Sequence, residues 1–463
     1  MPGRFVLDYR LENVRPASYN PRKIDPGTLD KLKRSLKELG LVKPLIVTEA
    51  GLIVAGHQRV KSLVAIGQYT APTFILESIN ERDEVLFNQM HNGTDLELDC
   101  TLRVPPSGKL GFEMIPARLV TCEQDDLPGE KLRREIARLL VTYGNWGTAV
   151  ATQSGEILNQ AHYVLTCLRL NLPVRVCRIP DAQRDAAKAY LWQQYGKFDY
   201  SHIERNTWNQ TYAQKYRLRS DEGGGSTLYR TFVIPDLKPG VRLLDFGCGQ
   251  ADYVKALSKQ GVNILGVEFY YRRGQFEIDT RAVHVMCGQV FGSLRSKGRF
   301  DSVICDSVLN SVDTPQAEHD VLTTLNAFCR EGGTVFFSSR SQERVQQLLR
   351  TKNAARKKQQ ERAVEFLDDN GFSALLKKGR WFFQKFHTRD QMHELAEQYF
   401  GPKIEYRSRS SSHLIKVTKS KELDPDQIQA SIEREFNLPW PNGLSVGKAA
   451  AAVEAYRQAL QLE

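Results

Sequence analysis

The sequence lacks several features that would place it in a specialised class of protein. Its eight cysteines are far apart, with no Cys-x-x-Cys pair and no Cys/His cluster at metal-site spacing. We therefore expect reduced thiols, no structural zinc and no other metal. No run of about 18 apolar residues occurs, and charged residues are spread through the first fifteen positions. This pattern predicts neither a membrane span nor a signal peptide, and hence a cytoplasmic protein that contacts no membrane.

The composition is that of an ordinary soluble globular chain. Its 463 residues are 41% hydrophobic and 25% charged, which excludes collagen-like, mucin-like and wholly disordered classes. At roughly 150 residues per domain, the length suggests about three domains. The net charge of +10 is unevenly distributed: residues 342–420 carry 17 basic and 9 acidic residues, whereas 231–341 carry 12 of each. Any nucleic-acid partner is therefore expected to contact the region 342–420.

An internal repeat occupies the N-terminal half, at an offset of about 104 residues. Gly40 corresponds to Gly144 and Gly51 to Gly155, and apolar residues at helical spacing in 29–39 recur in 132–143. Each copy predicts the order helix, glycine stop, strand, turn, strand, helix, strand, helix. We expect two small α+β domains, at 1–98 and 99–205.

The pattern changes after residue 230 to buried apolar runs that alternate with helical stretches. The predicted strands lie within 241–247, 262–269, 282–288, 300–308 and 333–339, with late strands in 381–388 and 411–419. This alternation predicts a Rossmann-like, doubly wound parallel sheet, and so an α/β multidomain protein. We place this domain at 231–420, with a basic helical insertion at 342–372 and a helical tail at 421–463. Residues 206–230 form a linker or a lid.

The run LLDFGCGQ from Leu243 to Gln250 carries the strongest chemical signal. An acidic residue, Asp245, lies near the end of a strand, and Gly247 and Gly249 follow in the turn to a helix. Glycines there let the backbone approach a bound ligand without Cβ clashes. Glu268, at the end of the next strand, lies where a carboxylate can accept both hydroxyls of a ribose.

This pattern resembles the class I methyltransferases that use S-adenosyl-L-methionine. The resemblance implies that Asp245, Gly247, Gly249 and Glu268 hold this methyl donor, with Asp245 near its amino group. In that family the third strand usually ends in an acid that contacts adenine, and Gln289 is our candidate for this position. The aromatic, glycine-rich stretch 208–232 is either a lid over the donor or a plain linker.

Asp306 closes the predicted fourth strand, where donor and acceptor meet in such folds. It is the candidate catalytic base, and a structural Asp that caps the next turn is the alternative. The strand lacks the [DNS]-P-P-[YFW] tetrapeptide of DNA amino-methylating enzymes and the Pro-Cys nucleophile of cytosine C5 enzymes. The usual residues for these two reactions are therefore absent.

The first copy carries an Asn-Pro-Arg at Asn20 to Arg22 and the run Gly56-His57-Gln58-Arg59. It resembles the ParB/sulfiredoxin superfamily, in which these motifs surround a nucleotide phosphate. Gly56 frees a turn at a helix N-terminus, where unpaired amides and Arg59 can converge on an anion. The resemblance implies a site at Asn20, Arg22, Gly56, His57, Gln58 and Arg59 for a nucleoside triphosphate, CTP or ATP. His57 replaces the sulfiredoxin cysteine.

In the second copy Gln160 replaces Gly56 and Tyr163 replaces Arg59, so we predict a degenerate duplicate without an anion site. A cluster of cations lies further along, within a predicted helix: Arg350, Lys352, Arg356, Lys357 and Lys358. These side chains could neutralise several phosphates of a nucleic acid, although a solvated helix is the ordinary explanation of such a run.

Together these features favour an S-adenosylmethionine-dependent methyltransferase that acts on DNA or a modified DNA base, of bacterial or phage type. The ParB-like half would bind DNA or a nucleotide, and the ParB-like or C-terminal helical regions could form a homodimer. One alternative is a methyltransferase for RNA, protein or a small molecule. Others are a non-catalytic ParB-like partition or regulatory protein, and phosphotransfer or nuclease chemistry at Arg59.

Overall fold

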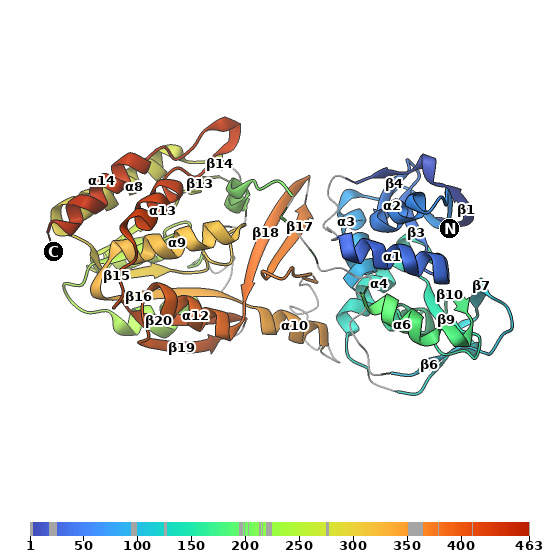
Figure 1. Cartoon of the computed structure of the whole chain (residues 1–463). Helices are drawn as coiled ribbons and strands as arrows, with labels where there is room; N and C mark the ends of the chain where they lie inside the picture. The colour runs from blue at the N-terminus through green and yellow to red at the C-terminus, as the bar shows by residue number, and fades with distance from the viewer. Residues whose placement is uncertain are drawn as a thin grey trace. The chain divides into compact units, whose positions relative to one another are not determined.

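The computed structural model divides the chain into two compact units (Figure 1). Unit 1 comprises Met1–Ile203, Val345–Asp369 and Leu376–Gly379, and unit 2 comprises Glu204–Arg344, Asn370–Leu375 and Arg380–Glu463. The structure describes residues 3–17, 26–93, 100–124, 127–193, 198, 200–201, 203–212, 214, 216–218, 225–274, 277–350, 364–377, 379–409 and 411–462. No helix within these ranges is long and apolar enough to cross a membrane.

The first repeat forms a five-stranded sheet in the order β1-β5-β3-β4-β2. Pro26 starts its first helix, whose residues Leu32 and Leu36 are buried, and Gly40 follows at a φ of +68°. The elements are β1 (Arg4–Arg10), β2 (Arg15–Pro16), α1 (Pro26–Leu39), β3 (Leu45–Thr48), β4 (Leu52–Ala55), α2 (His57–Ala65), β5 (Thr70–Leu76) and α3 (Glu81–Gly93).

The second repeat has the same order of helices and principal strands. Gly144 and Gly155 have positive φ, as do their counterparts in the first copy, and the equivalent of β4 is a single bridge between Ala151 and Ile157. Its elements are β7 (Gly111–Ile115), α4 (Glu130–Tyr143), β9 (Ala149–Thr152), α5 (Ala161–Arg169), β10 (Val174–Ile179) and α6 (Arg184–Gln193). The sheet order is β7-β10-β9, and β6 (Leu102–Arg103) pairs with β8 (Thr121–Cys122).

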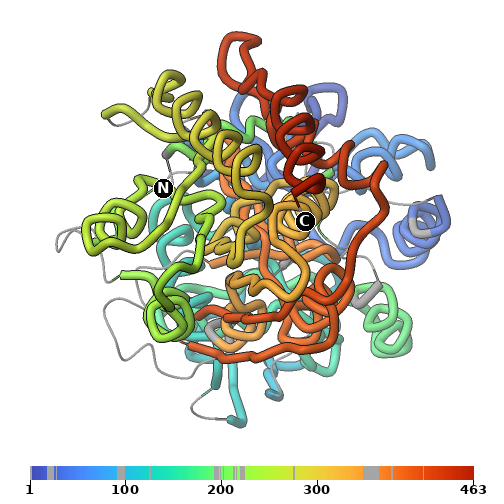
Figure 2. The backbone as a smooth tube through the Cα atoms, turned by 90° about the vertical axis from the view of Figure 1, so that its left-hand side faces the viewer, coloured from blue at the N-terminus to red at the C-terminus, as the bar shows by residue number. Residues whose placement is uncertain are grey.

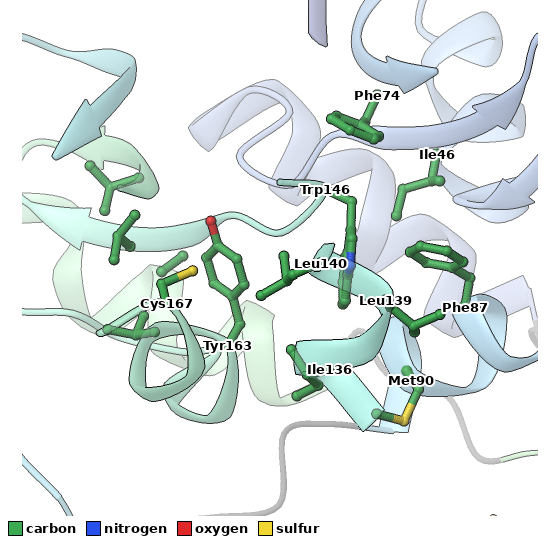
Figure 3. Packing of buried hydrophobic residues seen from close by; sticks show 14 of the residues in the cluster. Ile46, Phe74, Phe87, Met90, Ile136, Leu139, Leu140, Trp146, Tyr163 and Cys167 are labelled. Carbon is green, nitrogen blue, oxygen red and sulfur yellow. The ribbon is translucent and has the colours of Figure 1, made fainter. Parts of the chain in front are cut away.

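The two repeats share one hydrophobic core (Figure 3). Trp146, from the second copy, packs edge-on against Phe87 of the first at 5.1 Å and also meets Tyr163 of its own copy. Ile46 and Phe74 of the first copy belong to the same buried cluster. The boundary at residue 98 remains a prediction, but burial of this kind makes the two copies depend on each other for stability.

An ion pair with a buried carboxylate also joins the repeats. Asp83 on α3 is 4% exposed and accepts two hydrogen bonds from Arg138 on α4, at 2.7 and 3.0 Å. Tyr143 donates a third, at 2.7 Å. Burial opposes ionisation of Asp83, but these hydrogen bonds outweigh it and lower its pKa. The ionised carboxylate therefore has partners for its buried charge.

Unit 2, whose backbone course is included in the tube of Figure 2, contains an eight-stranded sheet. In this sheet β12-β11-β15-β16 are parallel neighbours. β16 also pairs with β18 and, antiparallel, with β20, so both predicted late strands join the sheet. The strands are β11 (Leu243–Phe246), β12 (Ile264–Val267), β15 (Phe300–Cys305), β16 (Cys329–Ser341), β17 (Phe372–Lys377), β18 (Arg380–His387), β19 (Ile404–Arg409) and β20 (Ser412–Thr418).

The strand predicted within 282–288 was wrong, because this segment lies in helix α8 (Thr280–Lys297). Asp279 caps the helix by accepting a hydrogen bond from the amide of Ala282 at 3.0 Å. The apolar residues recur at helical rather than strand spacing, and one face is buried: Val283, Cys287, Val290, Phe291 and Leu294. β12 is consequently the terminal strand of the described sheet.

The predicted basic helix is also shorter than expected. Helix α10 covers Gln342–Arg350, and residues 351–363 lie outside the described residues. Residues 364–371 are not helical: Phe366 is 6% exposed and joins the core of unit 1. The apolar Val364 and Phe366 gain more by burial in that core than by continuing a polar, solvated helix.

The remaining helices of unit 2 lie on its sheet and on one another. α9 (Pro315–Phe328) begins at a Thr314 cap, and α12 (Arg389–Tyr399) begins with a capping box. Helix α7 (Asp252–Lys259) follows β11. The predicted C-terminal tail contains α13 (Pro425–Glu435), which packs on α9, and α14 (Ala449–Leu460), which packs on α8 (Figure 1).

Candidate functional site

The loop after β11 has the backbone shape that its glycines predict. Gly247 has a φ of +76°, and a Cβ there would lie 2.3 Å from Cγ2 of Val308. Gly249 has a φ of +58°, and a Cβ there would meet no other atom within 4 Å. A side chain at Gly247 would be both strained and in collision. The absence of side chains at these two positions therefore allows a ligand at the carboxyl edge of the sheet to approach the backbone of the loop.

Glu268 anchors this loop from the neighbouring strand. Its Oε2 accepts a hydrogen bond from the amide of Gly249 at 2.9 Å, and Oε1 accepts one from the amide of Tyr270, also at 2.9 Å. Burial raises the pKa of Glu268 to about 7, and these backbone hydrogen bonds oppose that rise. Each carboxylate oxygen keeps a further lone pair for a ligand.

Asp245 is a buried carboxyl group with one unsatisfied oxygen. It is 4% exposed, and Oδ2 accepts a hydrogen bond of 2.6 Å from the hydroxyl of Tyr229. Oδ1 has no hydrogen-bond partner among the described residues. Burial raises the pKa of Asp245 to about 7, the Tyr229 bond lowers it, and the charges of Asp306 and Glu268 raise it again. A buried oxygen without a hydrogen bond lowers the stability of the folded state, unless a ligand donates a hydrogen bond to it.

The segment predicted as a linker or lid contacts this loop. Tyr229 stacks on Tyr253 of α7, with ring centroids 3.9 Å apart and planes 11° from parallel. Gln214 accepts a hydrogen bond from Gln250 at 2.8 Å, and the amide of Arg217 donates to Asp252. These contacts place parts of 214–229 beside the glycine loop. Movement of the segment as a lid remains a prediction.

Asp306 lies directly after β15, as predicted. Its Oδ1 accepts hydrogen bonds from the hydroxyls of Ser338 at 2.7 Å and Ser307 at 3.3 Å. Ser307 itself has a φ of +66° and donates its amide to Ser338. A turn capped by Asp306 and a base held by two serines both agree with these contacts.

Gln289 does not lie where its assignment required. The assignment assumed a third strand that ends near this residue, but Gln289 is an exposed residue of helix α8. No third strand follows β12 in the described parallel sheet. Gln289 therefore has no structural basis as a ligand for adenine.

The glycine turn of the first repeat is present, but two of its side chains are already engaged. Gly56 has a φ of +111° and directly precedes α2. His57 is 6% exposed, and its Nε2 accepts a hydrogen bond from the amide of Ala17 at 3.1 Å. Burial first, and then nearby cations, lower the pKa of His57 to about 4, so it is neutral at pH 7.

Arg59 donates hydrogen bonds to the carbonyl groups of Lys43 and Pro44, the latter at 2.8 Å. Arg59 therefore lies in the turn that begins at Gly56 and also holds the loop that precedes β3. Gln58 is partly buried in the first turn of α2. Asn20 and Arg22 lie outside the described residues. The structure brings Gly56, His57, Gln58 and Arg59 together at one helix N-terminus.

The second copy replaces the anion turn with packing contacts. Gln160 adopts the left-handed conformation of Gly56, with a φ of +60°, although a side chain is disfavoured there. Tyr163 is fully buried and donates a hydrogen bond to Asn145 at 2.7 Å. His162 is 1% exposed, with its ring against the backbone of Gly129.

The predicted nucleic-acid contacts fall largely outside the described part of the chain. Lys352, Arg356, Lys357 and Lys358 lie within 351–363, and the side chain of Arg350 is likewise not described.

Two residues of the site were missed from the sequence. Tyr229 was noted only as part of an aromatic stretch, although its place shortly before β11 was a usable signal. Ser338 belongs to the Ser-Ser pair that ends the fifth apolar run. Neither residue type indicates by itself which carboxylate it will contact, because those contacts join distant segments.

Comparison with known families supports both of the family resemblances inferred from the sequence. Residues 4–92 match the ParB N-terminal domain, and residues 226–401 match a methyltransferase domain. The probable chromosome-partitioning protein ParB of Campylobacter jejuni is 32% identical over 71 residues, which cover 14% of this chain and 26% of that protein. The ParB-like nuclease domain-containing protein YnaK of Escherichia coli is 26% identical over 85 residues, 18% of this chain and 98% of YnaK. The chain thus spans about a quarter of the first relative and nearly all of the second.

Solved structures show more distant similarity. The glycopeptide N-methyltransferase MtfA, in complex with S-adenosyl-L-homocysteine, is 10% identical with a TM-score of 0.27, over 42% of this chain and 90% of MtfA. The C-terminally truncated ParB of Caulobacter crescentus, in complex with CTP-γ-S, is 23% identical with a TM-score of 0.19, over 21% of this chain and 57% of that one.

Proposed function

We propose that this chain, which contains a ParB N-terminal domain and a methyltransferase domain, transfers a methyl group from S-adenosyl-L-methionine to DNA or to a modified DNA base. The observation that carries the donor assignment is the buried, unpartnered Oδ1 of Asp245 beside the glycine loop. An ammonium group suits this oxygen, because it supplies both hydrogen-bond donors and the opposite charge. The donor carries such a group at its amino-acid end.

The rest of the site fits the other end of the donor. Gly247 and Gly249 allow close approach of the backbone. The remaining lone pairs of Glu268 suit the two ribose hydroxyls, while its bonds to the amides of Gly249 and Tyr270 fix its direction. When bound, the donor supplies an electrophilic methyl group on a sulfonium ion. The chain's contribution is mainly to hold the two reacting groups in line.

Asp306 is the proposed base, where the acceptor must lose a proton. Ser338 and Ser307 occupy its Oδ1, which leaves Oδ2 to take a proton from an acceptor that lies over the end of β15. These two hydroxyl bonds keep the carboxylate from rotating, so the proton would be taken at a defined atom.

Two observations favour DNA as the acceptor. The ParB N-terminal match and the relatives named above suggest a DNA-related role for the first unit. The surplus of eight positive charges in 342–420 would attract a phosphodiester backbone, with the cluster at Arg350 to Lys358 as the proposed contact. Lys and Arg contacts of this kind position a duplex without reading its sequence.

The N-terminal unit is proposed to bind a nucleotide or DNA at Gly56 and α2. Because His57 and Arg59 already bond to the protein, the backbone amides at the N-terminus of α2 would supply most of the phosphate contacts. CTP and ATP are the candidate nucleotides, with Asn20, Arg22 and Gln58 as further candidate ligands.

One observation favours a different acceptor. β15 is followed by Asp306-Ser307-Val308-Leu309 rather than by the tetrapeptide of amino-methylating DNA enzymes. A methyltransferase for RNA, protein or a small molecule is therefore the second candidate.

The test has two stages. Calorimetry should show that S-adenosyl-L-homocysteine binds the full chain and that Asp245→Asn weakens this binding, since the variant cannot pair with an ammonium charge. Labelled donor is then offered with duplex DNA, RNA or whole cell extract, which contains both proteins and small molecules. Methyl transfer to DNA alone supports the proposal, whereas transfer to another acceptor selects the second candidate. Donor binding without transfer to any acceptor contradicts both.

DNA binding by the full chain should weaken steeply with salt and weaken further in the double variant Lys357→Ala/Lys358→Ala. The matched control, Lys259→Ala/Lys297→Ala, removes two exposed lysines from the electrically neutral region. Salt-independent binding, or equal loss in both double variants, would contradict the proposed contact.

A further inference from the structure

The C-terminal segment, residues 425–460, packs next to the donor site beside β12, where the described sheet has no further strand. β12 is the terminal strand of the described sheet, and the matched methyltransferase domain ends at residue 401. Helices α13 and α14 lie beyond that match, yet they pack on α9 and α8 (Figure 1). The turn that follows β12 begins with Glu268, so whatever holds this turn also sets the direction of the Glu268 carboxylate.

Aromatic side chains of the C-terminal segment hold that turn from two directions. Phe436, which is fully buried, meets Phe269 edge-on with centroids 5.0 Å apart. Trp440 is 4% exposed, and its Nε1 donates a hydrogen bond of 2.9 Å to the carbonyl of Phe269. On its other side Trp440 stacks on His284 of α8, at 5.6 Å between centroids. Phe269 is thus held through both its ring and its backbone.

Phe269 lies in the chain between Glu268 and Tyr270, the residue whose amide binds the Glu268 carboxylate. The residue before it is Glu268, and the residue after it, Tyr270, donates its amide to Oε1 of Glu268. A shift of the Phe269 carbonyl would therefore move the peptide groups on both sides and turn the carboxylate. Because Oε2 also accepts from Gly249, the glycine loop depends on the same turn.

We infer that the segment 425–460 is a structural part of the donor site, and that Trp440 is a positioning residue that aims Glu268 at the ribose end of the donor. This inference rests on the proposed function, because it assigns the ribose to Glu268. It goes beyond that function by adding a segment that lies outside the matched methyltransferase domain. Trp440 acts through Phe269 and does not itself contact the donor.

The experiment measures the dissociation constants of two ligands by calorimetry with the full chain. One is S-adenosyl-L-homocysteine, and the other is its analogue with hydrogen in place of both ribose hydroxyls. Trp440→Phe keeps a ring against His284 but removes the hydrogen-bond donor to Phe269. We expect five- to tenfold weaker binding of the first ligand, the size of one lost hydrogen bond, and less than twofold change for the analogue.

Two further variants separate positioning from general loosening. Val453→Ala removes buried apolar volume from α14 and should leave the ratio of the two dissociation constants unchanged. Phe436→Leu weakens the other contact with Phe269 and should change this ratio in the same direction as Trp440→Phe. Thermal melting of each variant identifies any that fails to fold, and Phe436→Leu then serves in place of Trp440→Phe.

The outcomes are distinct. An equal loss for both ligands, or no loss for either, would overturn the role of Trp440. A wild-type chain that binds neither ligand would instead overturn the proposed function, and this inference with it. A loss confined to the ligand with ribose hydroxyls supports the assignment.

Discussion

The buried carboxyl group of Asp245 makes donor binding depend on pH. In the free protein burial raises its pKa to about 7, so the group loses its proton within the range of ordinary assays. Only the ionised form can pair with the ammonium group of the donor. Donor affinity should therefore fall as the pH falls through 7, even though the ligand's ammonium charge is unchanged.

The size of the effect follows from the ionised fraction. A group with a pKa of about 7 is about three-quarters ionised at pH 7.5 and about one-tenth ionised at pH 6. The dissociation constant of S-adenosyl-L-homocysteine should thus rise about eightfold between these values, which corresponds to roughly 1.2 kcal/mol. Glu268, whose pKa is also raised to about 7, adds to the slope wherever its ionised form binds the ribose better.

The assay is calorimetry at four pH values between 6 and 7.5, on the wild type and two variants. Asp245→Asn should bind more weakly at every pH, by about 2 kcal/mol at pH 7.5, and should lose most of the pH dependence. Glu268→Gln should keep the part of the pH dependence that comes from Asp245. A wild-type affinity that is independent of pH, or an Asp245→Asn variant with the wild-type slope, would refute the reasoning.

Stability gives an independent readout with a defined sign. The folded-state pKa of Asp245 lies above its ordinary value, so its contribution to the free energy of unfolding is present at low pH and is lost as the pH rises through about 7. Asp245→Asn avoids that loss. Without ligand, the variant should melt at a higher temperature than the wild type at pH 7.5, with a smaller gain at pH 5.5. A melting temperature of Asp245→Asn below that of the wild type at pH 7.5 would show that the ionised Asp245 does not destabilise the folded state.

Three further predictions concern single contacts. Tyr229→Phe should weaken donor binding about fivefold and move its pH midpoint upward, because the carboxylate loses its only described hydrogen-bond donor; an unchanged midpoint would contradict this. Asp83→Ala should cost about 2 kcal/mol in urea unfolding, because it removes the buried acceptor of the hydrogen bonds from Arg138 and Tyr143 between the repeats, whereas Asp185→Ala on the surface should leave the urea midpoint unchanged. Gly56→Ala should cost about 2 kcal/mol, since its Cβ would lie 2.5 Å from a leucine side chain, and Gly67→Ala about half as much, since it adds only backbone strain; equal costs would count against the collision.

Local patterns in the sequence were sufficient for the principal elements. The glycine pairs and the apolar stripe predicted both repeats, and the strand before Gly247 and the strand before Asp306 are present as β11 and β15. The positive φ of Gly56 and Gly247 confirms the turns expected there. These features depend on neighbouring residues, and for that reason a single sequence is informative about them.

Other features depend on contacts between distant segments, which no local pattern specifies. The apolar residues at 282–288 suit a strand as well as a helix, and the difference was decided by the cap at Asp279 and by a helix face that is buried from Val283 to Leu294, about three turns. His57 was assigned to an anion, but the amide of Ala17, 40 residues earlier, occupies its ring nitrogen. The contact between Trp440 and Phe269 spans 171 residues. Burial and tertiary hydrogen bonds decide such cases.

The route of the chain through unit 1 has a consequence for its synthesis on the ribosome. Phe366 belongs to the core that the two repeats share, and the hydroxyl of Tyr200 donates a hydrogen bond of 2.8 Å to its carbonyl. These partners are 166 positions apart in the sequence, and most of the residues between them belong to unit 2. At about 5–20 residues per second, the first unit waits on the order of 10–30 s for its last core residue. The N-terminal unit therefore cannot reach its final packing before much of the methyltransferase domain has been translated.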